Sequence, residues 1–296
     1  HRDLHLSIRR QRQMCIRDRH TINRVYYDFE TYATDKSNPE IVPFLAVAKS
    51  MHNGERVHFF NDKGKTCVEK FFEWLHKVPN GSSCIAHNAG KFDANFIKRH
   101  ACTEKGMRPS IIPNGTKILS MTFGKEFNNL RSIDSMNFVA TSLDKLTADF
   151  IPEEKQGALK KGHFPYTLAT CHNIDNKVVL PHFPKQEEFE VKDMVTAGGR
   201  RFNFRVWHAG ESFKRKKSGE GYDIRNEALL YCEQDVECLA ESMECYRSES
   251  MEQSIMSEDR QELLRRYRNC RYLKGKIADT EALEGVDPFS FITLPS

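Results

Sequence analysis

Four carboxylates in three short motifs are the residues with the clearest chemistry. Asp28 and Glu30 lie two residues apart in the run YYDFET. Asp93 ends the segment HNAGKFD, and Asp235 ends the segment YCEQD. Oxygen ligands of this kind select Mg²⁺ or Mn²⁺ over zinc, and four of them can hold two such ions about 3.5–4 Å apart. The set therefore predicts in-line hydrolysis at phosphorus, in which one ion activates a water and the other stabilises the leaving 3′ oxygen.

Each motif also has an ordinary structural interpretation. Asp28 and Glu30 share one face of a strand, and a solvated strand end carrying two independent acids would look the same. Asp93 could simply cap a helix, and Asp235 could be a paired acid one turn after a buried Tyr231. The order of the three motifs favours the metal site over these separate alternatives. Within that site Tyr231 is expected to orient the water, because an ordinary phenol pKa near 10 makes it a poor base.

Strands and helices must alternate to bring these motifs together. Strands are expected at 24–32, 41–48, 56–60, 84–86, 117–123 and 129–133, and helices at 66–76, 92–99, 142–150, 223–246 and 258–277. Asn53 and Gly54 predict a tight turn between the second and third strands, and Ser142 is placed as an N-cap. Residues 152–221, rich in Pro, Gly, Lys and His, give no clear pattern. Together the elements indicate a mixed α/β layer structure.

The composition is that of an ordinary globular protein. The chain has 296 residues, 39% hydrophobic and 29% charged, and no apolar run long enough for a membrane span, so no membrane partner is expected. The net charge of +4 lies entirely in residues 1–20, which hold six Arg and two Asp. Net charge therefore does not indicate nucleic-acid binding. The nine Cys include no C-x-x-C pair, which predicts reduced thiols in a reducing compartment such as the nucleus, cytoplasm or mitochondrion.

Taken in order, the motifs resemble the three Exo motifs of the DEDDy 3′→5′ exonucleases. More narrowly, they are similar to the exonuclease domain of protein-primed family-B DNA polymerases, found in phages, linear plasmids, adenoviruses and Maverick/Polinton elements. The resemblance implies an RNase H-like α/β fold, a mixed sheet flanked by helices. It also implies two Mg²⁺ ions, replaceable by Mn²⁺, and a single-stranded DNA 3′ end or primer-template DNA as substrate. The implied metal ligands are Asp28, Glu30, Asp93 and Asp235.

The resemblance assigns further residues to the substrate. In the segment LKKGHFPY, Lys161 corresponds to a lysine that reaches the scissile phosphate, with Lys160 as the fallback and a solvated basic loop as the alternative. A serine that touches the strand is either Ser135, after Asp134, or Ser142 in the run SLDKL. Phe92 and Phe96 stack on terminal bases, unless they belong to the core. The other expected nucleic-acid contacts are Thr31, His87, Asn88 and Leu143.

The resemblance also predicts how the chain is divided. Residues 1–20 form a basic tail, disordered or non-native; residues 21–284 are the exonuclease domain; residues 285–296 are a truncated start of the polymerase domain. The polymerase domain in cis and a terminal priming protein are then the expected partners, and polymerase motifs are absent. The alternatives are a free-standing exonuclease on DNA or RNA, and an inert transposon-derived nucleic-acid-binding module. The run 214–217, with Arg200 and Arg201, is the best candidate for a phosphate-binding patch, and a solvated loop is its alternative.

Overall fold

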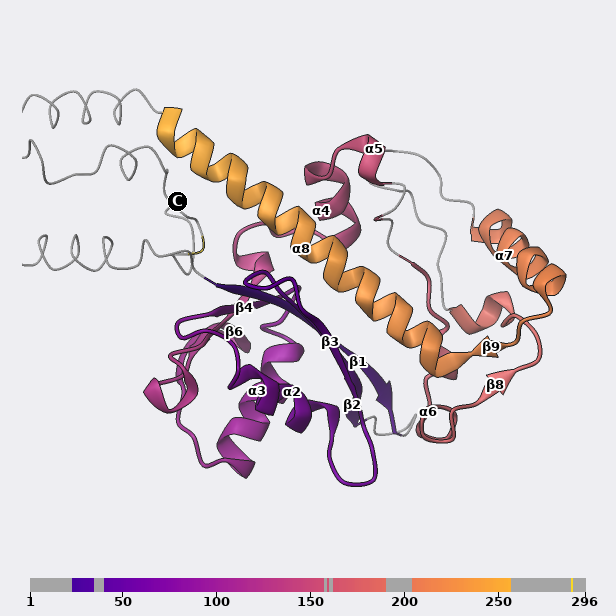
Figure 1. Cartoon of the computed structure of the whole chain (residues 1–296), viewed down its shortest axis with the longest axis horizontal. Coiled ribbons are helices and arrows are strands. Elements are labelled where there is room, and N and C mark those ends of the chain that lie inside the picture. The colour runs from indigo at the N-terminus through magenta and orange to yellow at the C-terminus, as the bar shows by residue number, and fades with distance from the viewer. Residues whose placement is uncertain are drawn as a thin grey trace, which may run out of the picture. The chain divides into compact units, whose positions relative to one another are not determined.

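The computed structural model describes residues 23–34, 40–156, 159, 162–189, 204–256 and 289 (Figure 1). One compact unit comprises Asn23–Glu241 and contains every strand of the described residues. A second unit comprises His1–Ile22 and Ser242–Ser296; of its described residues, Tyr246 and Phe289 pack with ring centroids 6.5 Å apart. Within the described residues, no helix combines the length and apolar character that a membrane span requires.

The main sheet has seven strands in the order β3-β2-β1-β4-β7-β6-β5. Their bounds are β1 (Arg24–Ala33), β2 (Ile41–Ser50), β3 (Arg56–Phe60), β4 (Ser83–Ala86), β5 (Ser110–Asn114), β6 (Lys117–Thr122) and β7 (Arg131–Asp134). The central strands β1, β4 and β7 are parallel, and every other neighbouring pair is antiparallel. This mixed sheet, flanked by helices, confirms the α/β, RNase H-like fold class expected from the sequence.

The α-helices are α2 (Cys67–Leu75), α3 (Asp93–Arg99), α4 (Leu143–Phe150), α5 (Glu153–Gln156), α6 (Cys171–Asp175), α7 (Phe204–Ser218) and α8 (Ile224–Met256). The π-helix η1 (His100–Glu104) extends α3, and the 3₁₀ turns are η2 (Lys125–Phe127), η3 (Ser135–Asn137), η4 (Tyr166–Leu168) and η5 (Gln186–Phe189). A small antiparallel sheet pairs β8 (Val179–Leu180) with β9 (Tyr222–Asp223). Helix α5, strand β8 and the other elements from η4 to α7 lie in the described part of the region 152–221, which the sequence left unassigned.

Strand β1 sorts its side chains between two environments. Tyr27 and Phe29 belong to the main apolar cluster, where the Tyr27 ring lies 5.1 Å from that of Phe71 on α2. Asp28 and Glu30 alternate with them and therefore face the other side of the sheet. Figure 1 shows α8 crossing that side, with α2 and α3 on the opposite one. The period of two in one strand thus separates the core from the acidic site.

Helix α2 closes the core beneath the sheet. Thr66 is its N-cap and forms a capping box with Glu69, which satisfies two backbone donors at the start of the helix. Phe71, fully buried, contacts the rings of Tyr27 and Trp74. Truncating such a residue to alanine costs about 3–5 kcal/mol, so Phe71→Ala is the single change expected to weaken this layer most.

All six strands and four of the five helices expected from the sequence occur, with small shifts at their ends. Helix α8 runs ten residues further than expected, to Met256, and strand β5 was missed. Strand β5 contains Pro113, which argues against a strand in the interior of a sheet; β5 is an edge strand, and its pairing is irregular between Ile112 and Pro113. The expected helix at 258–277 and the tail 1–20 lie outside the described residues.

Candidate active site

A pocket of about 350 Å³ collects the residues singled out by the motifs. It is formed by the end of β1, the loop between β4 and α3, the start of α4, the turn η4 and the middle of α8. All four acids line it, and its lining comprises Asp28, Phe29, Glu30, Thr31, His87, Asn88, Phe92, Asp93, Phe96, Leu143, Tyr166, Asp235 and Leu239. Three sequence motifs that together span more than 200 residues, from Asp28 to Asp235, therefore meet at one place.

Asp28 and Glu30 form a candidate metal-binding group with Cys232 of α8. One ligand atom from each of the three lies within 4.8 Å of the other two. The Cys232 thiol donates a weak hydrogen bond to Asp28 Oδ2 at 3.7 Å, and burial raises the pKa of that thiol well above its usual range. The pairing of β1 with β2 shifts register just after Glu30, the kind of irregularity that re-aims side chains beside active sites.

Asp93 is the first residue of α3, but its carboxylate does not act as an N-cap. The N-cap is Phe92, which has no side-chain cap, and Asp93 Oδ1 instead accepts the backbone N–H of Phe29 at 3.2 Å. The side chain is 4% exposed, and this burial, with a smaller contribution from the charge of Asp134, raises the pKa of Asp93 to about 7. A buried carboxylate that retains a proton near neutral pH is the kind of group that a divalent cation would restore to the charged form. The donor set and the burial therefore both fit a metal centre.

The loop between β4 and α3 is shaped by two special backbone positions. Asn88 lines the pocket in a left-handed conformation, with φ of 59°, which is uncommon for a residue other than glycine. Gly90 lies so close to β6 that a Cβ there would be 2.5 Å from the carbonyl oxygen of Ile118. Asp134 anchors the loop by accepting the N–H of Gly90 at 2.9 Å and that of Met136 at 3.0 Å. Asp134 thus has a structural role and lies outside the pocket lining.

The two serines considered for the strand contact have other partners. Ser135 is buried, and its hydroxyl shares a 2.9 Å hydrogen bond with Nδ1 of His87, so it acts on the pocket through that ring. Ser142 caps α4, where its hydroxyl accepts the N–H of Lys145 at 3.3 Å. Neither serine lines the pocket, whereas Leu143 does.

Two tyrosines meet at the side of the pocket that faces α8. The rings of Tyr166 and Tyr231 are perpendicular, with centroids 5.9 Å apart, and their hydroxyls are hydrogen-bonded. Burial, followed by the nearby charge of Asp235, raises the pKa of Tyr231 far above its usual range; burial and the charge of Glu30 do the same for Tyr166. Both therefore stay protonated. The sequence reasoning missed Tyr166; its signal was the aromatic residue that ends the segment GHFPY.

Ion pairs hold α8 against the outer strands of the sheet. Lys49 of β2 is only 9% exposed, and its Nζ lies 2.7 Å from Glu237 Oε1 and 3.4 Å from Glu241 Oε1. Arg56 of β3 pairs with Glu237 at 2.9 Å. A buried lysine requires such partners, so these pairs help to fix the position along the sheet of the helix that supplies Asp235.

The structure also places the remaining predicted residues. Thr31, His87, Asn88, Phe92 and Phe96 line the pocket with the acids. Phe92 is 53% exposed, so the alternative that it belongs to the core is wrong. Phe96 is partly buried and packs against the core cluster, with its ring 5.7 Å from that of Phe29. Lys161 and its fallback Lys160 lie outside the described residues, and their contact with the scissile phosphate stays a prediction.

The sequence of the chain matches a family of DNA polymerases. The model described as "DNA polymerase type B, organellar and viral" matches residues 78–261, which include the second and third acidic motifs. The chain belongs to this family. The match begins after Asp28 and Glu30, and the fold itself carries these two acids into the same pocket.

Solved structures give more distant similarities. Phi29 DNA polymerase complexed with single-stranded DNA is 14% identical with a TM-score of 0.41, over 86% of this chain and 35% of that one. The family B DNA polymerase from the hyperthermophilic archaeon Pyrobaculum calidifontis is 14% identical with a TM-score of 0.33, over 44% of this chain and 18% of that one. The chain thus spans about a third of the length of the Phi29 enzyme. No curated protein sequence matches it.

Proposed function

We propose that the chain is a metal-dependent 3′→5′ exonuclease that removes terminal nucleotides from single-stranded DNA, as the proofreading part of a type B polymerase. The observation that carries the proposal is the convergence of Asp28, Glu30, Asp93 and Asp235 in one pocket. Membership of a DNA polymerase family supports DNA as the substrate class. A polymerase domain in cis and a terminal priming protein complete the proposal as partners.

The four carboxylates would hold two Mg²⁺ ions, and Mn²⁺ would substitute for them. When bound, such ions lower the pKa of an attacking water and stabilise charge on the leaving 3′ oxygen. Cys232 lies beside this group as a protonated thiol. The ligands remain oxygens, which favours Mg²⁺ over softer ions.

The tyrosine pair places two protonated hydroxyls, hydrogen-bonded to each other, beside the acids. Because the pKa of both phenols is raised, neither residue removes a proton near neutral pH. Tyr231, one turn before Asp235 on α8, orients the attacking water. Tyr166, which lines the pocket beside Glu30, is placed to donate to the phosphate.

The rest of the pocket wall binds the strand without reading its sequence. Phe92, Phe96 and Leu143 line the pocket, and the two rings offer faces for the terminal bases. Thr31 and Asn88 bind the terminal sugar and phosphate. Lys161, close in sequence to Tyr166, stabilises the charge that develops on the scissile phosphate.

The direct test uses single-stranded DNA labelled at its 5′ end. With Mg²⁺ or Mn²⁺ we expect a ladder of shortened products that keep the label, and no shortening by Asp28→Ala or Asp235→Ala. Circular single-stranded DNA of the same composition, which has no end, should stay intact. If folded wild-type protein leaves the linear strand full-length with either ion, the exonuclease proposal fails. Faster shortening of RNA than of DNA would contradict the proposed substrate.

A further inference from the structure

Helix α7 has one face that is firmly held by its surroundings. The Phe204 ring lies 5.5 Å from that of Phe189, and Nε2 of His208 hydrogen-bonds the carbonyl of Pro184 at 2.7 Å. Arg215 forms a 2.5 Å ion pair with Glu227 at the start of α8. Residues 204, 208, 211 and 215 follow helical spacing on this inner face. These contacts fix the orientation of α7, and the same helical spacing determines which residues lie on its opposite, outer face.

The outer face of α7 carries two exposed apolar side chains with a glycine between them. Phe213 is 71% exposed, and Val206, seven residues earlier and thus on the same side, is 67% exposed. Between them lies Gly210, where an added Cβ would have no atom within 4 Å. Glycine weakens an exposed helix, and packing within the described chain gives no reason for it here. The arrangement leaves open space beside the helix backbone at Gly210, here called the notch, on the same face as Phe213.

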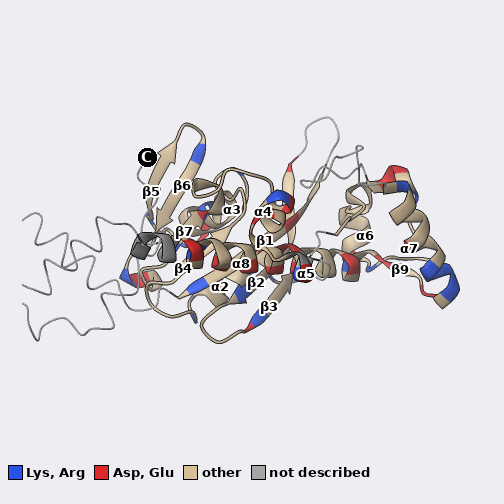
Figure 2. Ribbon diagram, turned by 90° about the horizontal axis from the view of Figure 1, so that it is seen from above, with Lys and Arg blue, Asp and Glu red and all other residues tan. Residues whose placement is uncertain are grey.

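Positive charge surrounds this notch. Lys217 lies one turn beyond Phe213 on the same face, and Lys214 and Lys216 flank it. Helix α7 holds five basic residues and one acidic residue, although the chain beyond residue 20 is neutral overall. Figure 2 shows the blue end of α7. Lys214 pairs with Glu211 at 2.7 Å, while Lys216 and Lys217 form no ion pair with any described residue.

We infer that the α7 strip, defined as Gly210, Phe213, Lys214, Lys216 and Lys217, binds single-stranded nucleic acid. One base stacks on the Phe213 ring above the notch, and the lysines bind the adjoining phosphates. Aromatic faces combined with a basic surface are the standard means of holding a single strand without reading its sequence. The choice of nucleic acid over an acidic protein rests on the proposed function. Residues 214–217, for which a loop was the alternative, are helical, and their lysines are exposed. Arg200 and Arg201, predicted in the same patch, lie outside the described residues.

Binding in the absence of metal tests the strip directly. The fluorescence anisotropy of labelled dT20, titrated with protein in EDTA, gives the affinity. We expect Phe213→Ala to weaken binding roughly tenfold. The double substitution Lys216→Gln and Lys217→Gln should lower the slope of log K against log salt by about 1.4, since each single-strand phosphate contact contributes about 0.7. The matched control is Lys77→Gln with Lys105→Gln, two exposed lysines in turns outside α7, which should change neither quantity.

Gly210→Gln separates binding from folding. Glutamine is a better helix former than glycine, so the melting temperature should rise or stay the same, while the side chain fills the notch and weakens dT20 binding. If the Phe213 and lysine variants bind within twofold of wild type, the strip is not a nucleic-acid site. Displacement of dT20 by a polyglutamate peptide at an equal concentration of charges would also overturn the proposal, in favour of an acidic protein partner.

Cleavage of a short strand distinguishes this inference from the proposed function. Shortening of a six-nucleotide substrate by the wild-type protein measures the exonuclease activity, and dT20 binding in EDTA measures the α7 strip. Loss of dT20 binding in these variants, when wild-type protein cleaves nothing, would sink only the exonuclease proposal. Wild-type cleavage with unchanged dT20 binding in the variants would sink only the α7 strip.

Discussion

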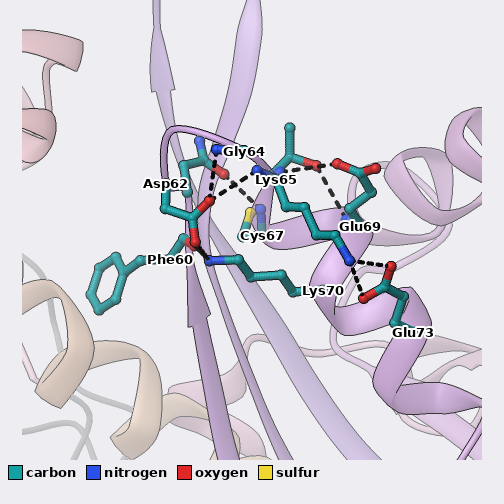
Figure 3. A network of polar contacts seen from close by, with 10 residues as sticks. Phe60, Asp62, Gly64, Lys65, Cys67, Glu69, Lys70 and Glu73 are labelled. Carbon is teal, nitrogen blue, oxygen red and sulfur yellow. Dashed lines mark hydrogen bonds and ion pairs between the residues drawn. The ribbon is translucent and has the colours of Figure 1, made fainter.

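Two groups of carboxylates in this chain have opposite surroundings. The first lies at the start of α2, where Asp62 pairs with Lys70 and accepts the N–H groups of Gly64 and Lys65 (Figure 3). The side chain of Lys65 reaches Glu73 at 2.7 Å. These lysines, through hydrogen bonds first of all, hold the pKa of both Asp62 and Glu73 below the usual range.

The second group lines the pocket, and there the surroundings act in the other direction. Burial raises the pKa of Asp93 to about 7. No lysine or arginine belongs to the pocket lining in the described part of the chain. The α2 acids are neutralised by cations of the chain itself, whereas the pocket gathers acids at a place suited to cations from solution. The same residue types therefore stabilise a turn in one region and prepare chemistry in the other.

The largest contrast between the two groups should appear on removing one charge from each. Asp235→Asn should lower the rate of exonuclease cleavage more than about a hundredfold, because a metal ligand supports several kcal/mol of transition-state stabilisation. Glu73→Gln makes the same carboxylate-to-amide change in the α2 group and should leave the rate unchanged. Initial rates on labelled single-stranded DNA with Mg²⁺ provide the comparison. Equal effects of the two substitutions on the rate would contradict the proposal that only the pocket acids take part in catalysis.

The second prediction concerns stability against pH without metal. The carboxyl of Asp93 titrates near 3.8 when unfolded and about 7 when folded, so the folded state binds more protons between these values. Its contribution to stability is therefore lost as pH rises from about 4 to 7. Asp93→Asn, which is always neutral, should be more stable than wild type at pH 8 by a few kcal/mol, on the order of 1.4 kcal/mol per pKa unit, and equal to it near pH 4.

Urea unfolding in EDTA at pH 4.5, 6 and 8 measures this difference. Adding Mg²⁺ at pH 8 should stabilise wild type and leave Asp93→Asn nearly unchanged, because binding to the native state raises its stability. A gap between the two proteins that does not vary with pH would show that Asp93 titrates normally in the fold.

The third prediction tests the neutral donors beside the acids. Tyr231→Phe should slow cleavage roughly tenfold, the value of one hydrogen bond of about 1.4 kcal/mol. The affinity for single-stranded DNA in EDTA should not change, because the ring and its packing remain. A loss of affinity equal to the loss of rate would assign Tyr231 to strand binding instead of water orientation.

The smallest effect is expected in the α2 group. Lys65→Met removes the exposed ion pair with Glu73 but leaves the capping box of Thr66 and Glu69. Exposed ion pairs contribute little, so the melting temperature should change by roughly 1 °C or less. Thr66→Ala is the matched comparison within the same turn, and it should lower the melting temperature clearly more, since an N-cap is lost. A larger effect of Lys65→Met would show that the ion pair with Glu73 contributes substantially to the stability of the fold.

Local patterns in the sequence were enough to predict most of the fold. The sequence predicted β1 at 24–32 and Ser142 as the N-cap of α4, and both are confirmed. Strand β5 was missed because its edge position, which tolerates Pro113, is a property of the whole sheet. Helix α7 was missed because its inner face packs against aromatic residues from distant turns, including Phe183 and Phe189.

The sequence predicted which residues form the candidate site. It did not predict how deeply they are buried or how burial changes their pKa values. Motif order identified the acids, but the raised pKa of Asp93 depends on burial that only the tertiary structure creates. Tyr166 reaches the pocket through a segment that packs around Tyr231, where the Phe164 ring lies 5.9 Å away. Long-range packing of this kind leaves little trace in local spacing.

The alternation along β1 makes this strand far more sensitive to insertions and deletions than to substitutions. Inserting or deleting one residue just before Asp28 would exchange the faces of the residues that follow it, carrying the acids into the aromatic layer around Phe71 and the ring of Phe29 into the pocket. Variant libraries across 24–30 should accordingly retain folded members among point substitutions and almost none among single-codon indels. Activity thus depends on the register of β1 as strictly as on the identity of the acids.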